Sequence, residues 1–137
     1  MKIATWNINS INSRIEQVIH WCKKDQPDVL CLQETKCVDE KFPQRQFREL
    51  GFEHIEFHGE KAYNGVAIIS KYPVSELQKN FPADKTDVPR RLIAGTIRGI
   101  CVVNVYVPHG TSLGSDKFTF KLDWLARLRK YFDQNYL

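Results

Sequence analysis

A carboxylate and an ammonium group directly follow the most uniformly apolar run of this chain. Residues 29–32 read Val-Leu-Cys-Leu, and residues 33–36 read Gln-Glu-Thr-Lys. An apolar run without alternation predicts a strand buried on both faces, and open α/β sheets usually carry their sites where strands end. Glu34 could therefore bind a hard cation, with Lys36 nearby for a phosphate. A lone glutamate at a strand end is more often only a solvated cap, so this interpretation depends on the other strand ends.

Another predicted strand, residues 100–107, ends in polar groups of a different kind. Tyr106 by itself is most simply a core aromatic. Asn104, however, lies two residues earlier on the same face, and buried polar groups need partners. His109 follows in a Pro-His-Gly turn, where it is most simply a loop residue and next a proton donor or phosphate contact.

The elements that would position these residues can be predicted from residue patterns. A first strand is expected over residues 2–8 and ends near Asn7, which is either a turn residue or a group that orients a carboxylate or a water. A capping box beginning at Ser13, followed by apolar residues at helical spacing, predicts a helix. That helix should end before Pro27, because the residue before a proline avoids the helical region.

The remainder of the chain predicts mainly strands, with a short helix near residues 43–50 and a long one near the end. Residues 92–97 and 100–107 flank Arg98-Gly99, which is a favourable two-residue hairpin turn. The final helix carries an apolar stripe of Phe118, Leu122, Leu125, Leu128 and Phe132. The predicted fold class is α/β, with a mixed β-sheet and flanking helices.

Composition limits the classes of protein that remain. The 137 residues are enough for one compact domain, and 42% hydrophobic residues argue against disorder. No apolar stretch approaches the length of a membrane span, and the N-terminus lacks the hydrophobic block of a signal peptide. The four cysteines show no C-x-x-C pairing, which argues against structural zinc and disulfides. We therefore expect a cytoplasmic protein.

Five segments carry a family resemblance when they are taken in order: KIATWNINSI, PDVLCLQETK, YNGVAIISK, RRLIAGTI and VVNVYVPHG. Together they resemble the N-terminal half of an exonuclease III-type apurinic/apyrimidinic endonuclease, a member of the endonuclease/exonuclease/phosphatase superfamily. The later segment KLDWLARLRKYF is similar too, so the resemblance covers essentially the whole chain. It implies one partial domain over residues 1–137, about half of a four-layered α/β sandwich, and a DNA-repair phosphodiesterase that cleaves the DNA backbone.

The resemblance also implies roles for individual residues. Glu34 would be a direct ligand of Mg²⁺ or Mn²⁺, Asn7 its neighbour in the metal site, and Tyr106 a catalytic phenol near the scissile phosphate. The implied phosphate or DNA-backbone contacts are Lys36, Arg90, Arg91, Asn104 and His109. The implied partner is double-stranded DNA with abasic sites or 3′ ends, with no membrane and no obligate protein partner.

Part of the family pattern has no counterpart in this sequence. The Gly-Asp-x-Asn strand end, a further aspartate and the C-terminal Ser-Asp-His of the family do not occur here, and His109 replaces the usual Asn or Gln. We therefore expect the C-terminal half of the domain to be absent, Mg²⁺ to bind weakly, and the isolated chain to have little or no nuclease activity. Two alternatives stay open: a non-catalytic DNA-binding or interaction module, and a superfamily phosphodiesterase acting on lipid or inositol phosphates.

Overall fold

The computed structural model describes residues 1–85 and 88–136. These residues form two compact units. The first consists of residues 1–80 and 85–106, and the second of residues 81–84 and the segment from Val107 onward. Within the described residues, no helix combines the length and the apolar character needed to cross a membrane.

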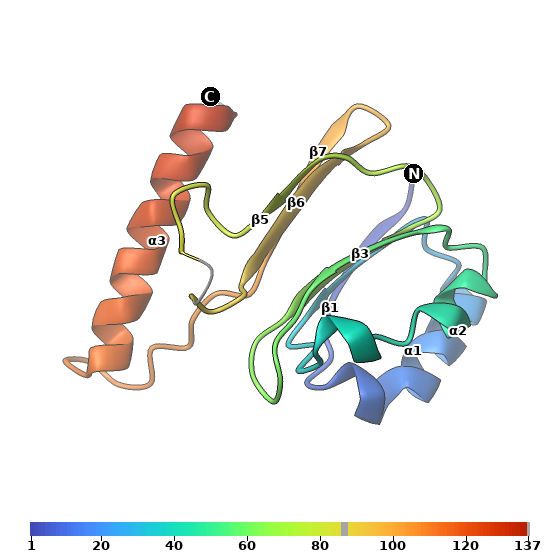
Figure 1. The fold of residues 1–137 in the computed structure, drawn as a ribbon, viewed down its shortest axis with the longest axis horizontal. Coiled ribbons are helices and arrows are strands. Elements are labelled where there is room, and N and C mark those ends of the chain that lie inside the picture. Colours follow the sequence, from blue (N-terminus) through green and yellow to red (C-terminus); the bar gives the residue numbers. More distant parts are fainter. Residues whose placement is uncertain (86–87, 137) are drawn as a thin grey trace. The chain divides into compact units, whose positions relative to one another are not determined.

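The first unit contains a four-stranded sheet in the order β1-β2-β4-β3. Strand β1 runs parallel to β2, whereas β2 and β3 both pair antiparallel with β4, which confirms the predicted mixed sheet. Helices α1 and α2 lie along one side of this sheet (Figure 1). The bounds are β1 Ile3–Asn7, α1 Ile11–Asp25, β2 Val29–Gln33, the 3₁₀ turn η1 Asp39–Lys41, α2 Gln44–Arg48, β3 His54–His58 and β4 Val66–Ser70.

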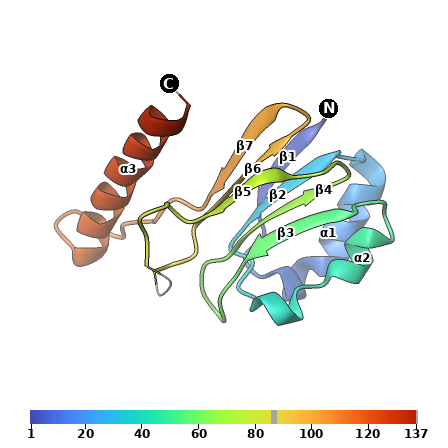
Figure 2. The same cartoon turned by 45° about the horizontal axis from the view of Figure 1, so that its top comes forward.

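A second, antiparallel sheet of the same unit is formed by β5 (Ser75–Lys79), β6 (Leu92–Ile97) and β7 (Ile100–Val105), in the order β5-β6-β7 (Figure 2). The hairpin between β6 and β7 turns at Arg98-Gly99 as predicted. The φ angles there are 50° and 79°, the left-handed values that such a turn requires. Strand β7 ends at Val105, so Tyr106 lies just beyond the strand.

Strand β2 is buried on both faces, as its uninterrupted apolar sequence predicts. Leu30 and Leu32 belong to the core cluster that includes residues of α1 and α2. Val29 and Cys31 belong to the cluster shared with β6 and β7. The four-stranded sheet therefore has helices on one face and the three-stranded sheet on the other, and β2 brings its polar C-terminal end to the edge of both cores.

Helix α1 ends before Pro27 as predicted but starts earlier than its capping box indicates. The N-cap is Ser10, whose side chain accepts a hydrogen bond from the Ser13 amide, so the prediction of Ser13 as the cap is wrong. The reason is tertiary: the Ser10 and Ile11 amides donate to the Glu34 and Thr35 carbonyls at 2.8 and 3.0 Å. These bonds satisfy amide groups that a helix start otherwise leaves without partners.

The second unit contains α3 (Asp116–Asn135), capped by Ser115. The buried residues of α3 are Trp124 and Tyr131, whose rings lie 5.6 and 5.9 Å from the ring of Phe81. The buried face therefore differs from the apolar stripe seen in the sequence, two members of which, Leu122 and Leu125, are exposed. Residues seven apart share one helix face, and two large aromatics on that face bury more area against Phe81 than leucines would.

Candidate functional site

Glu34 lies directly after β2, in a short segment with unusual backbone geometry. Glu34 and Lys36 have φ angles of 54° and 50°, which cost energy for residues other than glycine and cluster at functional sites. The segment is held from both sides by main-chain bonds. The Glu34 carbonyl accepts from the start of α1, while the Thr35 and Lys36 amides donate to the carbonyls of Gly65 and Asn64 at 3.1 and 2.9 Å.

The Glu34 carboxylate is the centre of a polar cluster. Asn7 Nδ2 donates to Oε1 at 3.1 Å, Lys36 Nζ lies 3.5 Å from Oε2, and the Tyr106 hydroxyl donates a hydrogen bond to the carboxylate. Partial burial raises the pKa of Glu34, but the bonds from Tyr106 and Asn7 and the charge of Lys36 outweigh it and lower the pKa below its usual value. Glu34 is therefore an ionised, partly exposed oxygen donor at neutral pH.

Tyr106 is held against this carboxylate by Arg91. The Arg91 guanidinium lies 4.6 Å from the centre of the Tyr106 ring, and its Nη1 donates to the Tyr106 carbonyl at 3.2 Å. The Tyr106 amide in turn donates to the Arg91 carbonyl at 2.8 Å. Burial and the Glu34 carboxylate raise the pKa of Tyr106, so the phenol stays protonated and able to donate.

Lys36 has a second partner that sequence reasoning did not single out. Its Nζ donates to Asn9 Oδ1 at 2.6 Å, and Asn9 has a φ of 47°. The signal was the Asn-x-Asn spacing at the end of β1, because residues two apart at a strand end can face the same site. Asn9 thus helps to fix the ammonium group beside Glu34.

Asn104 was predicted as a phosphate or DNA-backbone contact, and that role stays a prediction. The structure shows it 3% exposed, with its amide group donating to the Leu32 and Ala67 carbonyls. Its Oδ1 accepts from Gln33 Nε2 at 2.7 Å. Gln33 is a second residue that sequence reasoning left without a role, although a glutamine next to Glu34 in an apolar strand was a visible signal.

Arg90 lies outside the polar cluster, in contact with a neighbouring loop. Its Nη1 donates to the Gly59 carbonyl and lies 3.8 Å from Asp39 Oδ2, while its amide donates to Glu60 at 3.0 Å. His109 belongs to the second unit, where its Nδ1 accepts from a nearby amide. The predicted phosphate contacts of Arg90 and His109 stay predictions.

The donor set around Glu34 fits part of a site for a hard divalent cation. Among the described residues there is no group of three or more His, Cys, Asp and Glu side chains placed to hold a metal ion. Mg²⁺ commonly takes only one or two carboxylates and completes its shell with water and phosphate oxygens. Glu34 fits one such position. Asn7 Oδ1 accepts from the Asn9 amide at 3.2 Å, so in this arrangement Asn7 orients the carboxylate rather than offering its oxygen.

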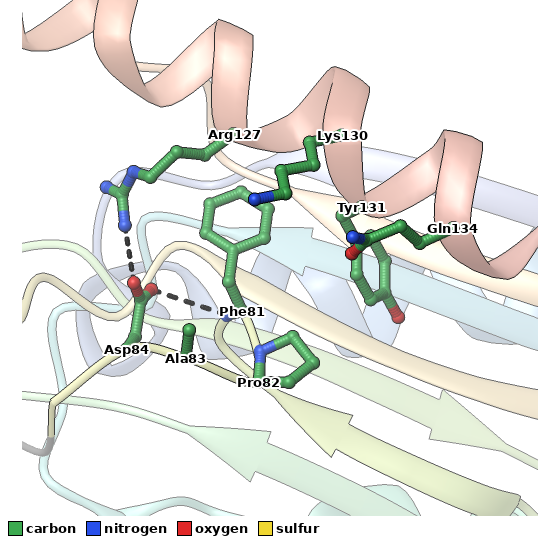
Figure 3. Close-up of a pocket in the computed structure, with 8 residues that line it drawn as sticks. All are labelled: Phe81, Pro82, Ala83, Asp84, Arg127, Lys130, Tyr131 and Gln134. Atoms are coloured by element: carbon green, nitrogen blue, oxygen red, sulfur yellow. Dashed lines mark hydrogen bonds and ion pairs between the residues drawn. The ribbon is translucent and has the colours of Figure 1, made fainter.

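The second unit contains a cavity of about 340 Å³, shown in Figure 3. Arg127 and Asp84 form an ion pair beside it, and its remaining lining residues are Phe81, Pro82, Ala83, Lys130, Tyr131 and Gln134. None of the predicted site residues lines this cavity. The polar cluster around Glu34 is built from the first unit alone.

Comparison with known proteins identifies the family of this chain. The model of the Endonuclease/Exonuclease/phosphatase family matches residues 4–135. The chain belongs to this family. It is 34% identical to exodeoxyribonuclease III of Haemophilus influenzae over 99% of its own length, and covers 52% of that protein. The family assignment made from the five sequence segments is thereby confirmed.

Solved structures of the family have the same fold as this chain. An AP endonuclease from Archaeoglobus fulgidus is 43% identical, with a TM-score of 0.94 over the whole chain and 52% of that protein. A 3′ phosphatase from Neisseria, solved with a product DNA hairpin, is 42% identical, with a TM-score of 0.91 over 96% of the chain and 51% of that protein. The chain therefore has the exonuclease III/AP endonuclease-type fold and spans about half the length of these family members.

Proposed function

We propose that this chain carries the N-terminal part of a Mg²⁺- or Mn²⁺-dependent DNA-repair phosphodiesterase, which cleaves the backbone of duplex DNA at abasic sites or 3′ ends. The observation that carries the proposal is the convergence of Glu34, Tyr106, Asn7 and Lys36 at the end of β2. DNA as the substrate is supported by the similarity to an exodeoxyribonuclease, to an AP endonuclease and to a phosphatase solved with a DNA product.

Glu34 would hold the divalent ion, with Asn7 as its neighbour in the metal site. When bound, the ion would act as a Lewis acid on a phosphoryl oxygen and stabilise the leaving alkoxide. Glu34 supplies the charge, because its lowered pKa keeps it ionised. Asn7 fixes the carboxylate by donating to Oε1 at 3.1 Å. A carboxylate fixed in this way needs little reorganisation to receive the ion.

Tyr106 and Lys36 would act on the phosphate itself. A phenol that stays protonated can donate to a phosphate oxygen as negative charge develops there. An ammonium group provides a point charge for the same phosphate. Both side chains now share Glu34 as a partner, so a phosphate bound beside Glu34 would lie within reach of both.

Water activation is the function that this cluster does not supply. Among the described residues no group of three or more His, Cys, Asp and Glu side chains is placed to hold a metal ion, none of the residues that contact the Glu34 carboxylate (Asn7, Lys36 and Tyr106) is a carboxylate or a histidine, and a general base must lie within hydrogen-bond reach of the attacking water. We propose that the part of the domain present in the relatives and outside these residues supplies it. The lack of a base keeps the non-catalytic DNA-binding module as the second candidate.

A hybrid protein tests the proposal. Residues 1–137 are joined to the C-terminal half of the H. influenzae exodeoxyribonuclease III, and the hybrid is assayed with Mg²⁺ on duplexes that carry an abasic site or a recessed 3′ end. We expect cleavage that falls by about 10²-fold or more in Glu34→Gln and in Tyr106→Phe. Glu16→Gln, on the exposed face of α1, is the matched control and should leave the rate unchanged.

Two outcomes would count against the proposal. Unchanged cleavage by the Glu34→Gln hybrid would remove Glu34 from the chemistry. Cleavage by the isolated chain, lost in Glu34→Ala, would show that the site is complete without a second half. An inactive hybrid that binds duplex DNA with the usual salt dependence would favour the non-catalytic module.

A further inference from the structure

Two hydrogen-bonded groups of the site, the Glu34 carboxylate and the Tyr106 hydroxyl, come from different sheets. Glu34 follows β2 of the four-stranded sheet, and Tyr106 follows β7 of the three-stranded sheet. Figure 2 shows both sheets of this unit. Apolar side chains fill the space between them, and such contacts are not directional. The relative placement of Glu34 and Tyr106 therefore needs a directional contact between the sheets close to the site.

Asn104 makes that contact. Its Nδ2 donates to the Leu32 carbonyl at 2.9 Å and to the Ala67 carbonyl at 2.8 Å. Leu32 and Ala67 are register partners in β2 and β4, so one amide group joins β7 to two neighbouring strands of the other sheet at the same level. With Gln33 Nε2 bound to Oδ1, both amide hydrogens and the oxygen have partners inside the protein.

The same network reaches the third strand that carries a site residue. Gln33 Nε2 also donates to Thr5 Oγ1 at 2.8 Å. Thr5 lies two residues before Asn7 on β1, just as Asn104 lies two residues before Tyr106. Gln33 directly precedes Glu34. The three network residues are therefore on the strands that present the three proposed catalytic residues, each one or two positions before its site residue.

We propose that Asn104, linked through Gln33, is a positioning residue that sets the Tyr106 hydroxyl against the Glu34 carboxylate. The role of Asn104 in catalysis rests on the proposed function, but its role in placing the Tyr106 hydroxyl does not. A direct phosphate contact by Asn104 would require a buried amide to give up hydrogen bonds that it already makes, which is costly for a buried polar group. Pure packing would be served better by an apolar side chain, because a buried amide must be fully hydrogen-bonded to avoid a penalty.

The test reads the position of Tyr106 without DNA or metal. The chain is labelled with 3-fluorotyrosine at its five tyrosines, and the ¹⁹F resonance of Tyr106 is assigned from its loss in Tyr106→Phe. Tyr63 is 70% exposed and gives the reference position for a solvated ring. Asn104→Ala and Gln33→Ala should both move the Tyr106 resonance toward that reference or broaden it by exchange.

Ser70→Ala is the matched control. Ser70 is also fully buried and hydrogen-bonded, at the end of β4 that pairs with the start of β2. Its loss should lower stability and leave the Tyr106 resonance in place. An unmoved resonance in folded Asn104→Ala would overturn the proposal. If that variant does not fold, Gln33→Ala decides, since it keeps both carbonyl bonds of Asn104. Because this readout needs no catalysis, a nuclease-inactive protein can still support or refute the positioning role.

Discussion

Gly65, the residue before β4, packs directly against the segment that carries Glu34. Its φ is +93°, and a Cβ atom added there would lie well inside van der Waals contact of Thr35 Oγ1 and 3.3 Å from the Lys36 amide nitrogen. Thr35 is fully buried and stands between Glu34 and Lys36. Gly65→Ala should therefore strain the backbone and push on the segment that presents both charged groups.

The expected loss of stability is the sum of a backbone energy and a steric energy. A left-handed φ costs a residue with a Cβ about 1–2 kcal/mol, and forcing extra volume into a packed region costs about 1–3 kcal/mol. We expect Gly65→Ala to lower the free energy of unfolding by about 2–5 kcal/mol. Gly51→Ala isolates the first term, since Gly51 has a φ of +90° and a Cβ there would have no neighbour within 4 Å. It should cost about 1–2 kcal/mol.

Urea unfolding followed by tryptophan fluorescence measures both variants on one scale. A double-mutant cycle with Thr35→Ala then separates the terms, because removal of Oγ1 relieves the steric part of Gly65→Ala and leaves the backbone part. Equal costs for Gly65→Ala and Gly51→Ala would refute the steric argument. So would a Thr35→Ala background in which the cost of Gly65→Ala is undiminished.

Three further predictions concern pH, DNA binding and the second unit. Burial, with positive charges nearby, lowers the pKa of His58 from 6.5 to about 4, so between these two pH values the unfolded chain binds a proton that the folded protein does not. The free energy of unfolding should therefore fall by up to about 3 kcal/mol as the pH drops from 6.5 to 4. Urea midpoints measured across this range should depend less on pH in His58→Gln. Lys36→Met should weaken duplex DNA binding and reduce the slope of log K against log salt concentration by about 1. Fluorescence anisotropy at several salt concentrations measures this slope, and an unchanged slope would contradict the prediction. Asp84→Asn should lower stability by about 1–2 kcal/mol, because it breaks a partly buried, charge-assisted bond to Arg127. Arg129→Met breaks an exposed ion pair and should change stability little. Equal shifts of the melting temperature in the two variants would contradict this prediction.

Local sequence patterns predicted much of the fold. The uninterrupted apolar run gave a doubly buried β2, Arg98-Gly99 gave the hairpin, and Pro27 marked the end of α1. Each of these depends on a few adjacent residues and on backbone sterics or solvent exclusion, which act in the same way in every fold. The patterns did not show that the strands after Ser70 form a separate sheet, because pairing between strands joins residues far apart in the chain.

The candidate site was predictable in its members more than in their roles. Glu34, Lys36, Asn7 and Tyr106 were singled out from their types and their places at strand ends, Arg91 came from the family resemblance, and the structure brings the five together. Asn104 was assigned to phosphate through the family resemblance, whereas its shared strand face with Tyr106 indicated only that its amide needs partners. Its burial depends on carbonyls of β2 and β4, which no local pattern reveals. Asn9 and Gln33 were missed for the same reason, since their partners lie 27 and 71 residues away.

The sequence by itself determined the family, the main strand and helix segments and the residues able to do chemistry, because side-chain type and hydrophobic period are local properties. Only the tertiary structure decided where α1 begins, which face of α3 is buried, and which polar groups touch Glu34. Those features depend on hydrogen bonds and contacts between segments far apart in the chain. The ionisation of Glu34 illustrates the division: the sequence supplied the carboxylate, and the folded protein lowered its pKa by placing Tyr106, Asn7 and Lys36 around it.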